Sequence, residues 1–312
     1  MILKVEKGIP LIGCIAFGVI DRGTNLLQVR PTSVCNLNCP FCSVDSGIHS
    51  KFHKVNYEVD CDYLIDEVKK VVEYKDEEVE INLDSVGEVL CYSKIEELVK
   101  GLRKIKNVKK ISMQTNGLLY KKLDVDIVNF SLHAMDEDLA KKLAGVECYN
   151  VKNVLENIKK YLKTCKVRLC PVWIPNVNDN EIPKIIQFAK ENNCELGIQK
   201  YETYSYSRQM KGVKPLTWWK FYHQLEKWEK EFGVKLKLTA KDVEIKKAKR
   251  IPEVFRKGEK VKLIIACKGW VDGQMIGVGR ERCVSINHCD KDIGDQVNAK
   301  ILETKNNIYL AE

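Results

Sequence analysis

The sequence predicts an α/β fold, namely an open (partial) parallel β/α barrel of about six units that is followed by a small all-β barrel. Two patterns indicate this. From residue 26 to about residue 199, short apolar runs alternate with stretches whose apolar residues recur every three or four positions. From residue 254 onward, short strand-like runs are separated by Gly and Asn turns.

Six segments of the first region have the length and composition of strands. The predicted strands are Leu26–Arg30, Val79–Leu83, Lys110–Thr115, Ile127–Leu132, Val167–Trp173 and Glu195–Gln199. Amphipathic helices are expected between them, around Val68, Leu98, Val154 and Ile185, with a shorter one over Asp136–Leu143. Alternation of strand and helix predicts a parallel sheet with right-handed crossovers, in which the chemistry lies at the carboxyl ends of the strands.

One further helix is predicted between Pro215 and Gly233, residues that suit a helix start and a helix end. Its apolar side chains recur at helical spacing, and we interpret them as core packing. They are Trp218, Phe221, Tyr222, Leu225, Trp228 and Phe232. The strands expected in the C-terminal barrel are Val261–Ala266, Gly277–Gly279, Gln296–Ile301 and Asn307–Leu310.

These patterns divide the chain into four parts. We expect an N-terminal extension over residues 1–25, a β/α barrel domain over 26–240, a basic linker over 241–253 and a β-barrel over 254–312. Residues 241–260 include eight basic and four acidic residues. The basic ones are Lys241, Lys246, Lys247, Lys249, Arg250, Arg256, Lys257 and Lys260. This surplus of positive charge fits either a solvated linker or a segment that contacts the phosphates of a nucleic acid.

The composition indicates a cytoplasmic protein. Among the 312 residues, 45% are hydrophobic, the net charge is +9, and no apolar run is long enough to cross a membrane. We expect no signal peptide. The 13 cysteines indicate reduced thiols, a metal site, or both. Most of these cysteines suit a core, including Cys14, Cys61, Cys91 and Cys194.

Three of the cysteines form a motif directly after the first predicted barrel strand. Cys35, Cys39 and Cys42 lie within eight residues, with Phe41 before the last. Three thiolates suit a cubane iron–sulfur cluster, and they leave one iron free to bind the amino and carboxylate groups of a methionine moiety. A zinc knuckle is the alternative, with His49 or His53 nearby, but the paired CxxC units typical of such sites are absent.

From Leu26 to Glu202 the sequence resembles the radical S-adenosylmethionine (SAM) superfamily. The resemblance implies that Cys35, Cys39 and Cys42 hold a 4Fe-4S cluster and that SAM is cleaved reductively to a 5′-deoxyadenosyl radical. Asp84–Val89 resembles the family's Gly-Gly-Glu-Pro segment at Gly87 and Glu88, and Thr115-Asn116-Gly117, Ser131 with His133, and Val172–Asn176 end later strands. The SAM contacts that it implies are Phe41, Gly87, Glu88, Asn116, Ser131 and Ile174. Asn116, Asn129 and Ser131 also suit turn capping.

Residues 254–312 resemble a TRAM domain, which is similar to oligonucleotide-binding (OB) barrels. The features that carry this resemblance are Lys257-Gly258-Glu259, Gly277-Val278-Gly279, Asp292–Val297 and Tyr309-Leu310-Ala311. A TRAM domain implies RNA binding, for which Lys268, Trp270, Arg280, Arg282 and Lys291 would supply charge and stacking. The alternative is that Trp270 packs under a loop and that the module only caps the barrel.

The whole arrangement resembles an archaeal-type family of radical SAM proteins with a terminal TRAM domain. It differs from tRNA methylthiotransferases, since only Cys14 precedes Cys35. We expect a radical SAM enzyme that modifies tRNA or rRNA, with methylation as one option, and that takes electrons from an external donor. Cys267, Cys283 and Cys289 are spare thiols for a methyl relay, although burial is the favoured interpretation. The alternatives are a peptide or small-metabolite substrate, or a non-catalytic iron–sulfur protein that binds RNA.

Overall fold

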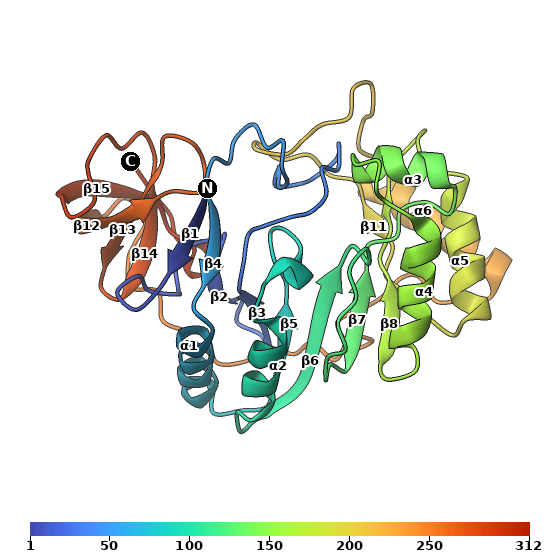
Figure 1. The fold of residues 1–312 in the computed structure, drawn as a ribbon, viewed down its shortest axis with the longest axis horizontal. Helices are drawn as coiled ribbons and strands as arrows, with labels where there is room; N and C mark the ends of the chain where they lie inside the picture. The colour runs from blue at the N-terminus through green and yellow to red at the C-terminus, as the bar shows by residue number, and fades with distance from the viewer. The chain divides into compact units, whose positions relative to one another are not determined.

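The computed structural model describes residues 1–312, which form two compact units. Unit 1 comprises Met1–Val34, Ser50–Ile111 and Lys246–Glu312, and unit 2 comprises Cys35–His49 and Ser112–Ile245. The boundary falls inside strand β6 (Val108–Thr115). Figure 1 labels most of the helices and strands. None of the helices is both long enough and apolar enough to span a membrane.

Unit 1 contains the first predicted strands with their expected bounds. Strand β3 (Leu26–Arg30) pairs with β5 (Val79–Leu83) in parallel and with β2 (Gly18–Asp21) in antiparallel orientation. A separate parallel pair joins β1 (Ile2–Val5) to β4 (Asn56–Val59). Helix α1 (Cys61–Lys75), helix α2 (Ile95–Arg103) and a 3₁₀ turn, η1 (Val89–Cys91), complete this part. The sequence patterns did not indicate β1, β2 and β4.

Unit 2 has the predicted parallel ladder. The last four residues of β6 pair with β7 (Ile127–Phe130), β7 pairs with β8 (Lys166–Leu169), and β8 pairs with β10 (Glu195–Leu196). The helices of this unit are α3 (Glu137–Ala144), α4 (Val151–Tyr161), α5 (Glu181–Glu191) and α6 (Trp218–Phe232).

Two strands of unit 2 that were predicted to be continuous are interrupted. The segment Val167–Trp173 divides into β8 and β9 (Val172–Trp173), since Pro171 between them has no N–H for the ladder. The segment Glu195–Gln199 divides into β10 and β11 (Gln199–Lys200), and β11 pairs with β9.

A closed five-stranded barrel forms the C-terminal part of unit 1, which confirms the small all-β barrel. Its strands are β12 (Lys260–Lys268), β13 (Met275–Gly279), β14 (Arg282–Ile286), β15 (Gln296–Glu303) and β16 (Leu310–Ala311), in the order β12-β13-β14-β16-β15. Strand β14 was not predicted. The strand expected over Asn307–Leu310 starts later, because a 3₁₀ turn, η2 (Lys305–Asn307), has left-handed φ values at Asn306 and Asn307.

The N-terminal segment packs against this barrel and does not extend freely. The N–H of Cys283 donates to the carbonyl of Ile12 at 2.8 Å, and the N–H of Tyr309 donates to that of Gly13 at 3.0 Å. Gly13 has a φ of 125°, and a Cβ at this position would lie 2.0 Å from the carbonyl oxygen of Cys283. This close approach therefore requires glycine.

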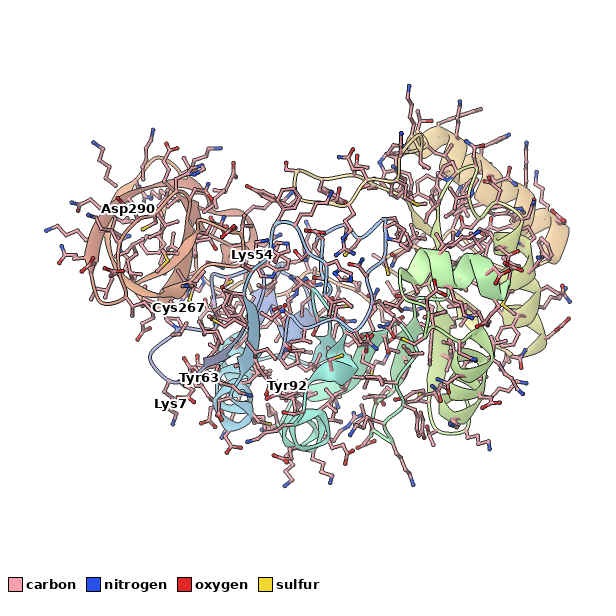
Figure 2. The ribbon with its side chains drawn as sticks, turned by 45° about the horizontal axis from the view of Figure 1, so that its top comes forward. Lys7, Lys54, Tyr63, Tyr92, Cys267 and Asp290 are labelled. Carbon is pink, nitrogen blue, oxygen red and sulfur yellow. The ribbon has the colours of Figure 1, made fainter.

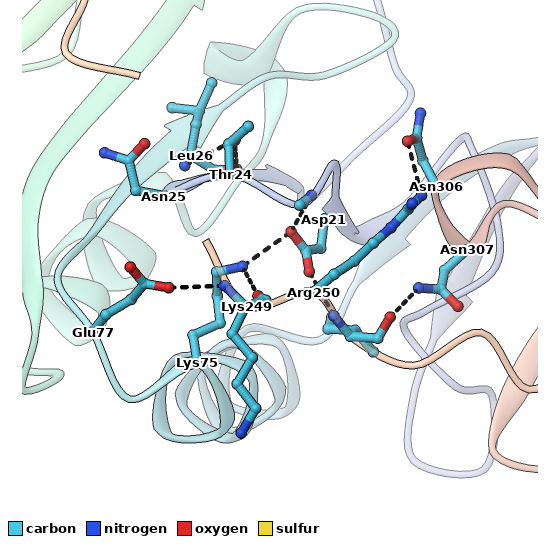
Figure 3. Close-up of polar contacts among 12 residues, drawn as sticks. Asp21, Thr24, Asn25, Leu26, Lys75, Glu77, Lys249, Arg250, Asn306 and Asn307 are labelled. Atoms are coloured by element: carbon cyan, nitrogen blue, oxygen red, sulfur yellow. Dashed lines mark hydrogen bonds and ion pairs between the residues drawn. The ribbon is translucent and has the colours of Figure 1, made fainter. Parts of the chain in front are cut away.

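Residues 246–251 are docked in unit 1, unlike a solvated linker. Lys75 and Asp21, whose side chains are fully buried, form an ion pair at 3.1 Å (Figure 3). Lys75 also donates to the carbonyl of Lys249, and Asp21 accepts from the N–H of Ile251 at 2.8 Å. Asn25 exchanges two further bonds with the backbone of Lys246. The backbone of the basic segment is thus part of the packed unit, although its lysine side chains are exposed.

Helix α6 begins and ends as the sequence indicates, but the prediction that its whole apolar stripe is core was wrong. Thr217 caps the N-terminus, and Gly233 ends the helix with a φ of 64°. Phe221, Leu225 and Trp228 are buried, whereas Trp218 and Tyr222 are 53% and 42% exposed. Successive helical residues are about 100° apart, so the stripe continues around the helix to the solvent side.

Candidate cluster and cofactor site

The three candidate ligands lie in unit 2, in a loop without helix or strand. Cys35, Cys39 and Cys42 are free thiols of intermediate exposure. The N–H of Cys42 donates to the carbonyl of Cys39 at 3.2 Å, and the N–H of Ser46 donates to the Sγ of Cys42 at 3.3 Å. A backbone donor to sulfur stabilises a thiolate and tunes the potential of a bound iron–sulfur cluster.

Arg208 holds this loop, and the sequence analysis did not identify it. Its guanidinium forms an ion pair with Asp45 and donates to the carbonyl of Cys39 at 2.9 Å and of Ser46 at 2.7 Å. Its own N–H donates to the carbonyl of Cys42 at 2.9 Å. The Asp45 side chain is fully buried, and Asp45 has a left-handed φ of 54°. One arginine thus bonds to the backbone at two of the three candidate ligands.

The chemistry of these thiols fits a cluster. Burial raises the pKa of the Cys39 thiol to about 12, the neighbouring Cys42 adds to this rise, and Arg208 opposes it. Without a cation, Cys39 is therefore a neutral thiol, and bound iron would favour the thiolate. The Oδ1 atom of Asn38, beside Cys39, is buried without a hydrogen-bond partner. Such an orphaned acceptor in a cysteine loop is consistent with a group that binds there.

The zinc-knuckle alternative is not supported by the side chains. No three His, Cys, Asp or Glu side chains are arranged to hold a single metal ion. A cubane distributes its thiolates over different irons, so it needs no such convergence. His53, one of the histidines considered for zinc, stacks on Trp270 in unit 1 with ring centroids 3.7 Å apart, and its Nδ1 lies 3.1 Å from the Trp270 carbonyl oxygen.

Residues from the end of one predicted strand meet the cluster loop within unit 2. Cys39, Ser131 and His133 line one small cavity, together with Leu37 and Tyr149. The ring of Phe41 packs edge-on against that of His133, at 4.9 Å.

His133 is neutral at pH 7. Burial lowers its pKa to about 4, and its Nδ1 accepts from the N–H of Val172 at 3.1 Å. The structure thus brings Phe41 and Ser131 beside the cysteine loop, and their contacts with SAM stay a prediction.

Asn116 and Ile174 are engaged by the protein itself. The amide of Asn116 donates to the Oδ1 of Asn36 in the cysteine loop at 2.8 Å, and its oxygen accepts from the N–H of Leu118 at 3.0 Å. The bond from Leu118 is the turn cap that the sequence indicated, and the bond to Asn36 is additional. The Ile174 side chain is buried, and its N–H donates to the Oδ1 of Asn178 at 2.7 Å. Their predicted SAM contacts remain untested.

Gly87 and Glu88 lie in unit 1, where the protein's own backbone approaches them. A Cβ on Gly87 would lie 2.2 Å from the carbonyl oxygen of Val34, and the N–H of Glu88 donates to that oxygen at 2.8 Å. One oxygen of the buried Glu88 carboxylate accepts from the N–H of Leu90. The nearby Ser85 hydroxyl is buried without a partner. The close approach of the Val34 carbonyl therefore requires glycine at position 87, and the predicted SAM contacts of Gly87 and Glu88 stay a prediction.

The barrel residues proposed for RNA contact are mostly engaged elsewhere. Trp270 is 7% exposed and stacked on His53, so its ring is packed against the protein, while RNA binding by the barrel stays a prediction. Arg280 pairs with Glu259 at 2.6 Å and lies over the Phe255 ring. Arg282 donates to the carbonyl of Glu281 at 3.0 Å. Lys268 and Lys291 are exposed.

The spare thiols of the barrel are core residues. Cys267 and Cys283 are buried with Cys14 in unit 1 (Figure 2 labels Cys267). Burial raises the pKa of the Cys267 thiol to about 12 and that of Cys283 well above its usual value. Cys289 is partly buried against the barrel core. The favoured burial interpretation is confirmed for Cys267 and Cys283.

Comparisons with known proteins agree with this geometry. Residues 29–189 match the family model described as the radical SAM superfamily. An uncharacterised protein of Methanocaldococcus jannaschii is 38% identical over 99% of this chain and 80% of its own length. The GTP 3′,8-cyclase of Helicobacter pylori is 25% identical over 62% of this chain and 61% of its own length.

Two solved structures share the fold. Streptococcus suis SuiB bound to its precursor peptide SuiA superposes with a TM-score of 0.52 and 18% identity, over 70% of this chain and 48% of SuiB. TYW1 with a bound lysine-pyruvate adduct superposes with a TM-score of 0.50 and 18% identity, over 68% of this chain and 74% of TYW1. At this identity the likeness concerns the fold alone.

Proposed function

We propose that this chain, which belongs to the radical SAM superfamily, modifies RNA. Membership of the superfamily brings a 4Fe-4S cluster and SAM as cofactors. When bound, the cluster supplies one electron that cleaves SAM into methionine and a 5′-deoxyadenosyl radical, which takes a hydrogen atom from an unactivated carbon. The electron comes from an external donor.

The cysteine loop supplies the cluster ligands. Cys35, Cys39 and Cys42 bind as thiolates, and the Ser46 N–H stabilises the Cys42 sulfur. Arg208 keeps the loop closed around them. Replacing all three cysteines with Ala should remove iron and sulfide from the reconstituted protein, and retention of the full cluster in that variant would contradict this assignment.

One face of the C-terminal barrel supports RNA as the substrate. The residues on this barrel face alternate with buried ones along the paired strands β12 and β15, and all are exposed. They are Lys260, Lys262, Ile264, Gln296, Asn298 and Lys300. Lys260 lies directly opposite Lys300, and none of the three lysines has an ion-pair partner. Like charges placed opposite each other destabilise a sheet, so this face favours a polyanion.

The reaction that we propose is functionalisation of an RNA carbon, of which methylation is one form. The cyclase relatives act, by their name, on GTP, so a nucleotide substrate has a precedent in the superfamily. A methyl group carried by Cys267 or Cys283 is inconsistent with their burial and with their raised thiol pKa values. Any methylation would have to proceed without these two thiols.

RNA binding by the barrel face can be measured directly. Changing Lys260, Lys262 and Lys300 together to Gln should weaken binding of the full chain to a labelled structured RNA. It should also flatten the dependence of log affinity on log salt by about 0.7–0.9 for each phosphate that the variant no longer neutralises. The matched control changes Lys100, Lys104 and Lys106, which are exposed on and after α2, to Gln. Equal slopes for the two triple variants would contradict the proposed face.

Turnover separates the candidate substrates. In the reduced holoenzyme, RNA should increase the formation of 5′-deoxyadenosine and should itself carry the product, as detected by nucleoside mass spectrometry. If deoxyadenosine formed at the same rate with and without RNA and no RNA product appeared, a peptide or metabolite substrate would be favoured. If none formed under strong reductant, the protein would be a non-catalytic RNA binder.

A further inference from the structure

Helix α6 of unit 2 exposes aromatic side chains that a core does not explain. Trp219 is 71% exposed, Trp218 is 53% exposed and Tyr222 is 42% exposed. A tryptophan has a large apolar surface, and monomeric proteins rarely leave two of them side by side in solvent.

The helix is nevertheless well packed on its other side. Phe221, Leu225 and Trp228 are buried, and Trp173 lies against Phe221 and Trp228 with ring centroids 5.8 and 5.0 Å apart. The exposed rings are therefore additional to a complete inner stripe. Their exposure does not reflect a helix that has failed to dock.

The exposed rings are already ordered in pairs. Trp219 stacks on His223 at 5.0 Å with an interplanar angle of 8°, and Trp218 stacks on Tyr222 at 5.6 Å with an angle of 24°. Each pair is one helical turn apart, so the helix itself sets its geometry. Trp219 has one face on His223 and is the most exposed of the rings, which leaves surface for another planar group.

Lysines lie over one of these rings, next to them in the helix and in the segment before it. The ammonium of Lys200 lies 4.8 Å from the Trp218 ring centroid and 3.0 Å from Glu202, which in turn accepts from the hydroxyl of the exposed Tyr204. Three further lysines are exposed without an ion-pair partner. They are Lys211 and Lys214 in the preceding loop and Lys220 beside Trp219. Stacked aromatics among unpaired lysines match the chemistry that binds single-stranded nucleic acid.

We propose that this aromatic face, formed by Tyr204, Trp218, Trp219 and Tyr222, binds unpaired bases of RNA. The inference rests on the proposed function, because it assigns a second contact to the same substrate class. Trp219 stacks on a base, while Lys211, Lys214 and Lys220 contact the flanking phosphates. A strand that is recognised through its bases must be unpaired here, so the preferred RNA is a loop or an end and not a duplex.

The test compares two apolar substitutions. Trp219→Phe keeps an aromatic ring, whereas Trp219→Leu keeps an apolar side chain without one. Both variants keep the helix and its buried stripe. A fluorescein-labelled unpaired oligonucleotide of about twelve uridines and adenosines, and the same strand in a duplex, serve as probes in fluorescence anisotropy with the full chain.

We expect Trp219→Leu to weaken binding of the unpaired RNA by roughly tenfold, with an unchanged salt slope, because stacking is not electrostatic. Trp219→Phe should retain most of the affinity, and duplex binding should change little in either variant. Equal affinity of the wild type and Trp219→Leu would overturn the inference while leaving RNA binding by the barrel face intact.

Two other outcomes are distinguishable. If the wild type bound neither RNA, the proposed function itself would fail. If the wild type dimerised and the Trp219→Leu variant lost this dimer, whereas RNA affinity did not depend on the aromatic ring, the face would be a contact between copies of this chain and the inference would be overturned.

Discussion

Replacing Arg208 with Met should make the iron–sulfur cluster labile without removing a ligand. The guanidinium forms an ion pair with the Asp45 carboxylate and donates to three carbonyls of the cysteine loop. Methionine keeps the apolar stem and makes none of these bonds. The Asp45 side chain, which is fully buried, then loses the cation with which it is paired.

The size of the effect follows from that burial. Breaking a buried pair by removing one partner costs about 3–5 kcal/mol. Each 1.4 kcal/mol is a factor of ten, so the open form of the loop should become roughly 10² to 4 × 10³ times more populated. Adding Asp45→Asn to the Arg208→Met variant removes the uncompensated negative charge and should restore part of the stability. The single change Arg208→Lys keeps the positive charge but lacks the paired N–H donors of the guanidinium.

The assay is the rate of iron transfer to an excess of chelator under anaerobic conditions, followed by absorbance. Arg168→Met is the matched control in the same unit, because Arg168 pairs with Glu195, whose side chain is 43% exposed. A more exposed pair is worth at most about 1 kcal/mol. Identical iron release from the Arg208 and Arg168 variants would refute the positioning role of Arg208.

Two further substitutions test unit 1. Lys75→Met should lower the free energy of unfolding of the full chain by about 3–5 kcal/mol in urea titrations, because it leaves the buried Asp21 carboxylate without its cation. Gly87→Ala should reduce the iron bound after anaerobic reconstitution, since the added Cβ would lie 2.2 Å from the carbonyl oxygen of Val34, the residue that precedes Cys35.

Each of these has a control. Lys70→Met on the same helix as Lys75 breaks an exposed pair with Glu67 and should lower the stability much less. Gly197→Ala places a Cβ 3.1 Å from the flexible side chain of Arg168 and should leave the iron content unchanged. Equal stabilities of the two lysine variants, or full iron in Gly87→Ala, would contradict the respective argument.

The sequence predicted the parallel ladder because its strands are continuous apolar runs between regular helices. Strands β3 and β5 have the expected bounds. The strands that it missed, β1, β2, β4 and β14, lie outside the alternation of one strand with one helix by which the ladder was recognised. The aromatic stripe of α6 was misassigned because Trp and Tyr count as apolar in any such pattern, while their rings also suit an exposed binding face.

Local motifs could be predicted from the sequence, whereas contacts between distant segments could not. The ligands Cys35, Cys39 and Cys42 follow one another along the chain and form a motif that can be recognised locally. The docked segment around Lys249 could not be recognised, since its contacts with Lys75 and Glu77 depend on residues far away in sequence. Charge alone described this segment as a linker, and only backbone bonds show that it belongs to the packed unit.

The cysteine loop also depends on contacts with residues that are far away in the sequence. The loop that carries the cysteines has no helix or strand, so no ladder of backbone bonds holds its shape. Its restraints come from polar residues 80 and 163 positions away, namely Asn116 on Asn36 and Arg208 on Asp45. Cluster retention should therefore depend on these residues nearly as much as on the thiols. Because they do not bind iron, their removal should change how fast iron leaves and not how many irons the loop can hold.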